Sequence, residues 1–163
     1  KAVHSFSGGM RQRFGIAQAL LGNPKIIIVD EPTAGLDPEE RNRFNNLLSE
    51  IGESIIVILS THIVEDVRDL CTKMAVIANG KLILEGNPNE AVNSLKDKIW
   101  MKAIQKTELE SHKEHFNIIS SHLNSGKLNI HVYSEQRPDS EFELVSPDLN
   151  DVYFNVLSQN LKK

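Results

Sequence analysis

Cysteine is almost absent from this sequence: Cys71 is the only one among 163 residues. A single cysteine excludes an internal disulfide framework and fits a reducing, cytosolic compartment. Long hydrophobic runs are absent too. The longest aliphatic segments, residues 26–29 and 55–59, are far shorter than the roughly 20 apolar residues that cross a bilayer. The sequence therefore predicts no transmembrane helix.

The chain also lacks an excess of positive charge. It contains 18 Lys and Arg residues and 22 Asp and Glu residues, for a net charge of −4. Without a basic stripe we expect no nucleic-acid partner. Hydrophobic residues make up 40% of the chain and charged residues 25%, as in ordinary globular proteins. The length allows one full domain or two small ones.

The first half alternates strand and helix signals. Two aliphatic runs, residues 25–29 and 54–60, predict strands buried on both faces. Between them, Asp37-Pro38-Glu39-Glu40 offers an N-cap aspartate, proline at the first helical position and acids in the first turn. Strands alternating with helices predict a parallel α/β sheet. The other expected helices are residues 10–21 and 63–71.

The second half predicts a different organisation. Asn79-Gly80 between two apolar runs is a strong hairpin signal, and a short helix is expected at residues 88–95. From residue 96 onward the chain is more polar, and we predict a small α+β domain over 96–163, separate from a first domain over 1–95. Its expected strands are 99–104, 128–133 and 141–145, and its expected helices are 108–123 and 149–157.

Four short motifs follow one another between residues 6 and 62. They are Phe6-Ser7-Gly8-Gly9-Met10-Arg11-Gln12-Arg13, Ile26-Ile27-Ile28-Val29-Asp30-Glu31-Pro32-Thr33, Ala34-Gly35-Leu36-Asp37-Pro38 and Ser60-Thr61-His62. The series resembles the signature motif, Walker B strand, D-loop and switch histidine of ATP-binding-cassette (ABC) ATPases. This resemblance implies part of a P-loop NTPase α/β fold, a parallel sheet with flanking helices, with ATP and Mg²⁺ as cofactors.

The Ser7-Gly8-Gly9 motif precedes a helix, where free backbone N–H groups and the helix dipole favour an anion. A simple capped turn is the alternative for an isolated motif of this kind. The resemblance implies that Ser7, Gly8, Gly9 and Met10 contact the γ-phosphate of ATP held by the opposite subunit of a dimer. It also implies that Asp37 reaches across the dimer interface, a role compatible with capping a helix.

Asp30 and Glu31 follow an aliphatic strand, and the carboxyl ends of parallel strands face the crevice in which α/β sheets bind ligands. We expect Asp30 to hold Mg²⁺ through water, and Glu31 to act as the general base for the attacking water. Two surface acids before Pro32 are the alternative. The resemblance implies that His62 hydrogen-bonds the γ-phosphate, whereas a lone histidine after a strand is usually structural.

A phosphate-binding P-loop is missing from these 163 residues. The loop needs Gly, four residues, then Gly-Lys and Ser or Thr. Gly-Lys occurs at Gly80-Lys81 and Gly126-Lys127, but Ala75 and Ser121 stand where the first glycine belongs. We therefore expect the C-terminal half of an ABC ATPase subunit that is inactive alone, although the intact protein hydrolyses ATP.

The end of the chain, Ser146-Pro147-Asp148-Leu149-Asn150-Asp151-Val152-Tyr153-Phe154, resembles the closing segment of the ATPase subunits of many prokaryotic exporters. This resemblance implies an exporter subunit at the cytoplasmic face of the membrane, peripheral to a transmembrane permease and paired with a second ATPase subunit. Two alternatives stay open. One is a non-catalytic half-cassette that pairs with a P-loop partner, and the other is a soluble ABC ATPase of DNA repair or translation.

Overall fold

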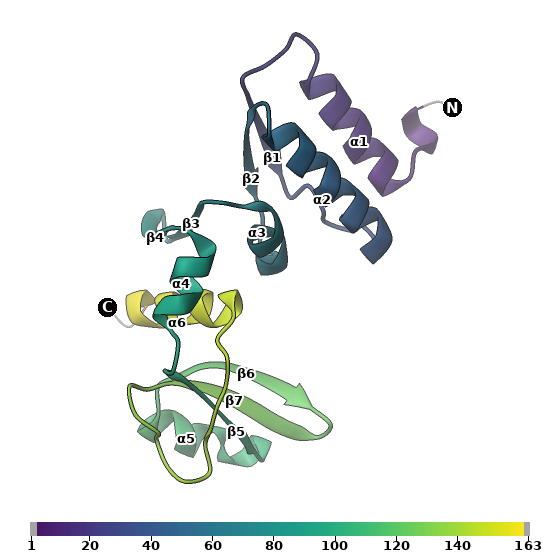
Figure 1. Cartoon of the computed structure of the whole chain (residues 1–163). Helices are drawn as coiled ribbons and strands as arrows, with labels where there is room; N and C mark the ends of the chain where they lie inside the picture. The colour runs from purple at the N-terminus through teal and green to yellow at the C-terminus, as the bar shows by residue number, and fades with distance from the viewer. Residues whose placement is uncertain (1–2, 162–163) are drawn as a thin grey trace. The chain divides into compact units, whose positions relative to one another are not determined.

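The computed structural model describes residues 3–161, which form two compact units divided after Cys71 (Figure 1). None of the helices built by these residues combines the length and apolar character needed to cross a bilayer.

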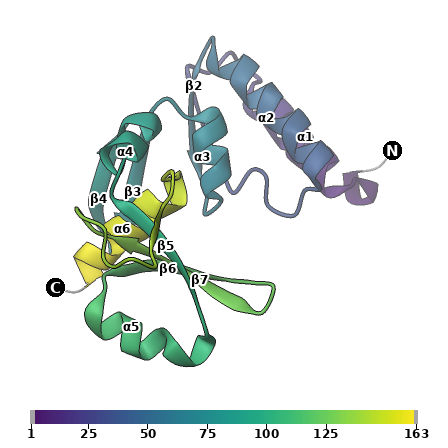
Figure 2. The same ribbon diagram turned by 60° about the horizontal axis from the view of Figure 1, so that its bottom comes forward.

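The first unit contains a parallel α/β arrangement, as the sequence predicts. Its elements in order are η1 (Val3–Ser5), α1 (Gly8–Ala19), β1 (Ile26–Asp30), α2 (Pro38–Gly52), β2 (Ile56–Ser60) and α3 (Val64–Leu70). β1 and β2 pair in parallel, with Ile26 opposite Ile56 and Asp30 opposite Ser60. The two strands therefore end side by side at the same edge. α1 and α2 lie alongside each other in both views (Figures 1 and 2).

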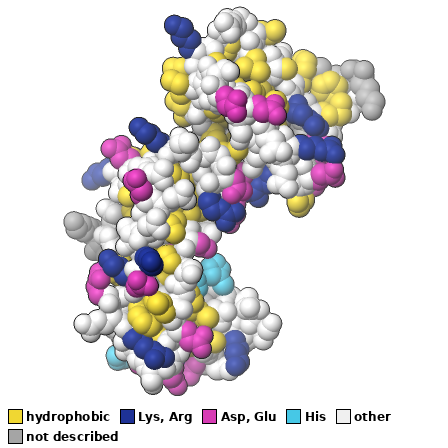
Figure 3. All heavy atoms as spheres, viewed as in Figure 1, with side chains coloured by type: hydrophobic (Ala, Val, Ile, Leu, Met, Phe, Trp, Pro, Cys, Tyr) yellow, Lys and Arg dark blue, Asp and Glu magenta, His cyan; other side chains and the backbone are white. Residues whose placement is uncertain are grey.

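Only one face of the β1–β2 pair is covered by described residues. Ile27 packs with Ile16 of α1 and with Phe44 and Leu48 of α2, and all four are buried. The opposite face remains exposed, and hydrophobic side chains reach the surface of this unit (Figure 3). Its apolar residues are Ile26, Ile28, Ile56 and Ile58, which are 50–76% exposed. The prediction of strands buried on both faces is wrong here, because α1 and α2 both pack on the same face.

The second unit begins with the predicted hairpin. β3 (Met74–Ala78) and β4 (Lys81–Gly86) pair antiparallel around Asn79 and Gly80. Both turn residues have positive φ, 50° and 71°, which is the conformation that the Asn-Gly pair favours in a two-residue turn. Asn87 then caps α4 (Pro88–Ser94) by accepting from two backbone N–H groups.

A four-stranded antiparallel sheet follows, in the order β6-β7-β5-β8, with α5 packing on one face and α6 on the other. The elements are β5 (Ile99–Ile104), η2 (Lys106–Glu108), α5 (Leu109–His115), β6 (Ile118–Asn124), β7 (Lys127–Tyr133), β8 (Glu143–Leu144) and α6 (Leu149–Leu161). On the α5 face, Ile104, Ile130, Val132 and Phe142 form a buried core. The predicted α+β composition is confirmed.

Two predicted elements of this unit are wrong in detail. The helix expected over 108–123 ends at His115, because Phe116 turns to extended backbone and packs its ring 5.0 Å from that of Phe142. Residues 118–124 instead form β6, which pairs with β7 around a two-residue turn, Ser125-Gly126, with φ of 49° and 83°. The strand expected at 141–145 shrinks to two residues, since Arg137 and Asp139 hold the preceding backbone in a turn.

The predicted domain boundary after residue 95 falls inside the second unit. α6 contacts α4 and β4, so the hairpin and short helix pack with the C-terminal sheet. As a statement about the domains of the whole protein, the division into 1–95 and 96–163 stays a prediction.

Candidate functional site

Asp30 and Ser60 end the two parallel strands and are joined by a hydrogen bond from the Ser60 hydroxyl to Asp30 Oδ1. The backbone N–H of the next residue, Glu31, donates to the carbonyl of Ser60 at 2.9 Å. The chain therefore leaves both strands at one point, as the parallel pairing requires. Ser60 belongs to the motif that contains His62, but nothing in the sequence assigned it this contact.

Glu31 and His62 face each other directly after these strand ends. His62 Nδ1 lies 2.8 Å from Glu31 Oε1. Since an ionised carboxylate only accepts hydrogen bonds, Nδ1 carries the proton in this pair. The imidazole is 76% exposed, and the Glu31 side chain is 36% exposed. The pair is therefore open to a ligand at the carboxyl ends of the strands, where α/β sheets bind ligands.

Two further features single out Glu31. Its φ is +45°, in the left-handed region that residues other than glycine seldom occupy. Such backbone persists only where the surroundings hold it, and it concentrates at functional sites. Its second carboxylate oxygen, Oε2, is buried without a hydrogen-bond partner among residues 3–161. A buried acceptor without a donor is unfavourable, so stability alone does not explain the position of this side chain.

The Ser7-Gly8-Gly9 motif forms the N-terminus of α1. Ser7 is the N-cap, and its hydroxyl accepts from Met10 N at 3.2 Å. Gly9 is buried against α2, and the Glu40 carboxylate there is held by Arg13 at 2.9 Å. The sequence motif is thus fixed to the helix that follows the D-loop.

Asp37 is the N-cap of α2 and accepts from Glu40 N at 2.8 Å. Its expected capping role is therefore observed. Asp37 is connected to Glu31 by the short segment 31–37, in which Ala34 N donates to Glu31 O and Leu36 N donates to Thr33 O, both at 3.2 Å.

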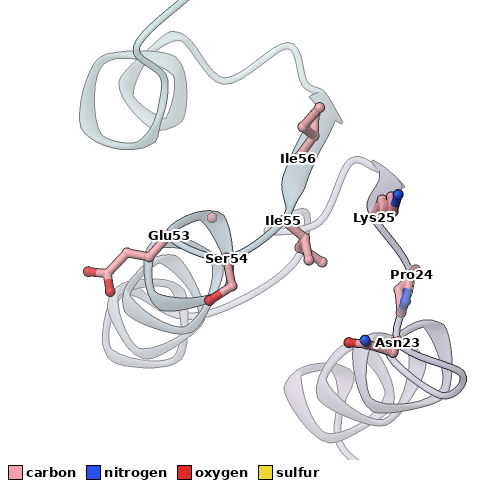
Figure 4. A pocket seen from close by; sticks show the side chains of 8 residues that line it. Asn23, Pro24, Lys25, Glu53, Ser54, Ile55 and Ile56 are labelled. Atoms are coloured by element: carbon pink, nitrogen blue, oxygen red, sulfur yellow. The ribbon is translucent and has the colours of Figure 1, made fainter.

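The predicted site residues fall into two groups. Asp30, Glu31 and His62 gather at the strand ends, while Ser7, Gly8, Gly9, Met10 and Asp37 lie at the N-termini of α1 and α2. An open pocket of about 510 Å³ lies elsewhere, at the amino ends of β1 and β2, between residues 23–25 and 52–56 (Figure 4). We place the candidate site at Asp30, Glu31 and His62, because these side chains can bind a metal or transfer a proton. None of the predicted site residues lines the pocket.

The family model described as ABC transporter matches residues 1–34. The methionine import ATP-binding protein MetN of Bacillus subtilis (strain 168) is 37% identical over 125 residues, covering 75% of this chain and 37% of the relative. YdbJ, an uncharacterized ABC transporter ATP-binding protein of the same organism, is 32% identical over 165 residues, covering 98% of this chain and 52% of the relative. The chain belongs to the ABC transporter ATP-binding protein family.

Solved structures agree with this ABC assignment. The cbiO1 protein of Clostridium perfringens, described as part of the ABC transporter complex cbiONQ, is 39% identical with a TM-score of 0.53. The similarity covers 57% of this chain and 38% of that one. The α/β ABC ATPase fold is thereby shown. The chain spans 37% and 52% of the length of the two curated relatives above.

The Asp30 side chain suits Mg²⁺, because its carboxylate is exposed and offers the hard oxygen atoms that this ion prefers. Among the described residues 3–161, no three His, Cys, Asp or Glu side chains come together as a metal site. Asp30 would thus hold the ion through a coordinated water and leave its remaining positions to other waters and phosphate oxygens, in keeping with the hydration that Mg²⁺ retains beside nucleotides.

Proposed function

We propose that the full-length protein is the ATP-hydrolysing subunit of an ABC membrane transporter. The observation that carries this proposal is the Glu31–His62 pair, 2.8 Å apart, next to Asp30 at the ends of two parallel strands. A carboxylate base, a carboxylate suited to Mg²⁺ and an imidazole at one edge are groups that can support phosphate hydrolysis.

In this mechanism Glu31 accepts a proton from the water that attacks the γ-phosphate. His62 holds Glu31 through Nδ1, and its other ring nitrogen contacts the γ-phosphate. Asp30 would hold Mg²⁺ through water, and the chemistry that the ion would supply there is neutralisation of negative charge on the phosphate oxygens.

The second group of residues acts on ATP held by the opposite subunit. Ser7, Gly8, Gly9 and Met10 form the N-terminus of α1, where the helix dipole and the backbone N–H groups of the two glycines stabilise the γ-phosphate. Asp37 contacts the partner across the dimer interface. The P-loop that holds the nucleotide belongs to a part of the protein outside these 163 residues.

The protein partners are a transmembrane permease and a second ATPase subunit, and the assembly lies at the cytoplasmic face of the membrane. Residues 1–95 belong to the nucleotide-binding domain, and residues 96–163 form its C-terminal extension. Co-purification of the full-length protein with a permease from membranes, and its release by alkaline washing, test these proposals together. A protein found only in the supernatant before any wash contradicts them.

Export is the proposed direction of transport, supported by the resemblance of residues 146–154 to the closing segment of exporter subunits. Similarity alone does not decide it, since MetN is an import protein. In inverted membrane vesicles that contain the complex, ATP should drive cargo into the lumen. ATP-driven release of cargo from the lumen would reverse the assignment.

The hydrolytic function is tested by Mg²⁺-dependent phosphate release from ATP by the full-length protein. Wild type should release phosphate, and Glu31→Gln should reduce the rate by a factor of about 100 or more, because an amide cannot accept the proton. Glu39→Gln, which changes an exposed acid on α2, is the matched control and should keep the wild-type rate. Equal rates for Glu31→Gln and wild type would refute the proposed role.

A further inference from the structure

Asp66 is a fully buried carboxylate in α3, with 0% of its surface exposed. It accepts hydrogen bonds from three side chains of two other segments of the first unit. The Thr33 hydroxyl donates to Oδ2, and Arg41 Nε and Asn45 Nδ2 donate to Oδ1 at 2.8 and 3.2 Å. Thr33 is itself only 2% exposed. A buried carboxylate is strongly unfavourable unless it is paired and hydrogen-bonded in this way.

These contacts join the segments that carry the site. Thr33 lies two residues after Glu31, and Asp66 lies four residues after His62. The backbone between them is short and hydrogen-bonded, since Ala34 N donates to Glu31 O and Asp66 N donates to Ile63 O. One carboxylate of α3 therefore ties the loop after β1 to the helix that follows β2.

Fold stability alone explains this cluster poorly. Asn45 Oδ1 is buried without a hydrogen-bond partner among residues 3–161, which is unfavourable. Well-packed apolar residues in place of a buried ionic cluster are often as stable or more stable. The hydrogen bonds of Asp66 instead fix the geometry of the surrounding segments. Glu31 depends on such support because its backbone is held at a φ of +45°.

We propose that Asp66, acting through Thr33, is a positioning residue for hydrolysis that holds Glu31 and His62 at the distance at which they act. This inference rests on the proposed ATPase function and adds a residue to it. Asp66 touches neither the nucleotide nor the reacting water. Its effect is on the orientation of Glu31, so its loss should slow chemistry more than it weakens binding of ATP.

The test uses Thr33→Val, which keeps the volume of the side chain but removes its hydroxyl, and Thr33→Ser, which restores the hydroxyl. In the full-length protein we expect Thr33→Val to lower kcat for ATP by about 10- to 100-fold, with KM nearly unchanged, because small misplacements of catalytic groups have effects of this size. Thr33→Ser should recover most of kcat. Asp69→Asn, on an exposed acid of the same helix, is the control and should behave as wild type.

Amide hydrogen exchange supplies a second readout that does not depend on activity. Thr33→Val should speed exchange at Ala34 and Leu36, whose N–H groups bond within the 31–36 turn, and leave the core of α2 unchanged. If Thr33→Val does not fold, Thr33→Ala, which also removes the hydroxyl, takes its place with the same expectations. Exchange that rises everywhere, or nowhere, would overturn the inference.

The two proposals fail in different ways. A wild-type protein without ATPase activity refutes the proposed function, and hydrogen exchange then decides whether Asp66 orders the turn. A wild type that hydrolyses ATP and is inactivated by Glu31→Gln, combined with a folded Thr33→Val variant of normal kcat, refutes only the positioning role.

Discussion

Gly9 lies so close to Glu40 that a Cβ on this glycine would be 1.8 Å from Glu40 Oε2. Arg13 holds both oxygens of this carboxylate at 2.9–3.0 Å, so its displacement would disturb an ion pair. The packing of α1 on α2 therefore favours glycine at this position of the signature motif, whatever the residue also does for a phosphate. This contact gives a stability prediction that is independent of nucleotide.

Gly9→Ala should destabilise the chain by about 1–2 kcal/mol, as overpacking and a displaced ion pair do. Most of that loss should disappear when Glu40→Ala is also present. Gly15→Ala is the matched control in the same helix, where an added Cβ meets nothing within 4 Å. It should stabilise by about 0.5–1 kcal/mol. Denaturant unfolding measures Gly9→Ala, Glu40→Ala, the double variant and Gly15→Ala, and an equal loss for Gly9→Ala with and without Glu40 would contradict the packing explanation.

The second unit should show pH-dependent stability from His131 on β7, whose Nδ1 lies 2.7 Å from Asp151 Oδ1 on α6. The hydrogen bond and the charges of Asp151 and Asp148 raise the pKa of His131 above its ordinary 6.5, although burial opposes this. Because the folded state binds the proton more tightly than the unfolded state, the pair stabilises fully below pH 6.5. Its contribution is lost as the pH rises through the raised pKa.

His131→Gln should therefore lose more stability at pH 5.5 than at pH 8.5. The measurement is the free energy of unfolding of wild type and variant across that range. His122→Gln, an exposed histidine on β6, is the control and should track wild type at every pH. A His131→Gln deficit that is constant with pH would show that the protonated pair contributes nothing.

The 163-residue chain alone should bind ATP weakly or not at all, because its sequence contains no P-loop to position and neutralise the phosphates. Titration calorimetry with Mg²⁺ and ATP measures this directly. Micromolar affinity would overturn the expectation.

Removal of residues 96–163 from the full-length protein should leave basal ATP hydrolysis near the wild-type rate, since all proposed catalytic residues precede residue 63. The truncation also removes α6, which contacts α4 and β4, so some loss of stability is expected. Hydrolysis should therefore be measured where circular dichroism shows a folded protein. A folded truncation without hydrolysis would place the extension in the catalytic site.

Much of the fold could be predicted from local signals. The Asp37 cap, the Asn79-Gly80 turn and the aliphatic run before Asp30 each specify their element through nearby residues. The helix predicted through residue 123 failed because the Ser125-Gly126 turn, which lacks the stronger Asn-Gly signal, makes residues 118–124 a strand. The face on which β1 is buried depends on partners distant in sequence.

The candidate site, like the fold, could be predicted from the sequence only in part. The contact of His62 with Glu31 follows from motif order and parallel strands, so it could be anticipated. The burial of Asp66 could not, because an acid in the first turn of a helix ordinarily lies in solvent. Its partners come from residues 33, 41 and 45, and only the folded structure brings them together.

The central claim, that Glu31 accepts the proton of the attacking water, is tested most directly by single-turnover hydrolysis in the full-length protein. ATP occupancy and γ-phosphate cleavage are measured in the same sample of wild type and Glu31→Gln, with Mg²⁺ present. We predict equal occupancy, with cleavage slowed by a factor of about 100 or more in the variant. Cleavage at the wild-type rate with ATP fully bound would contradict the claim.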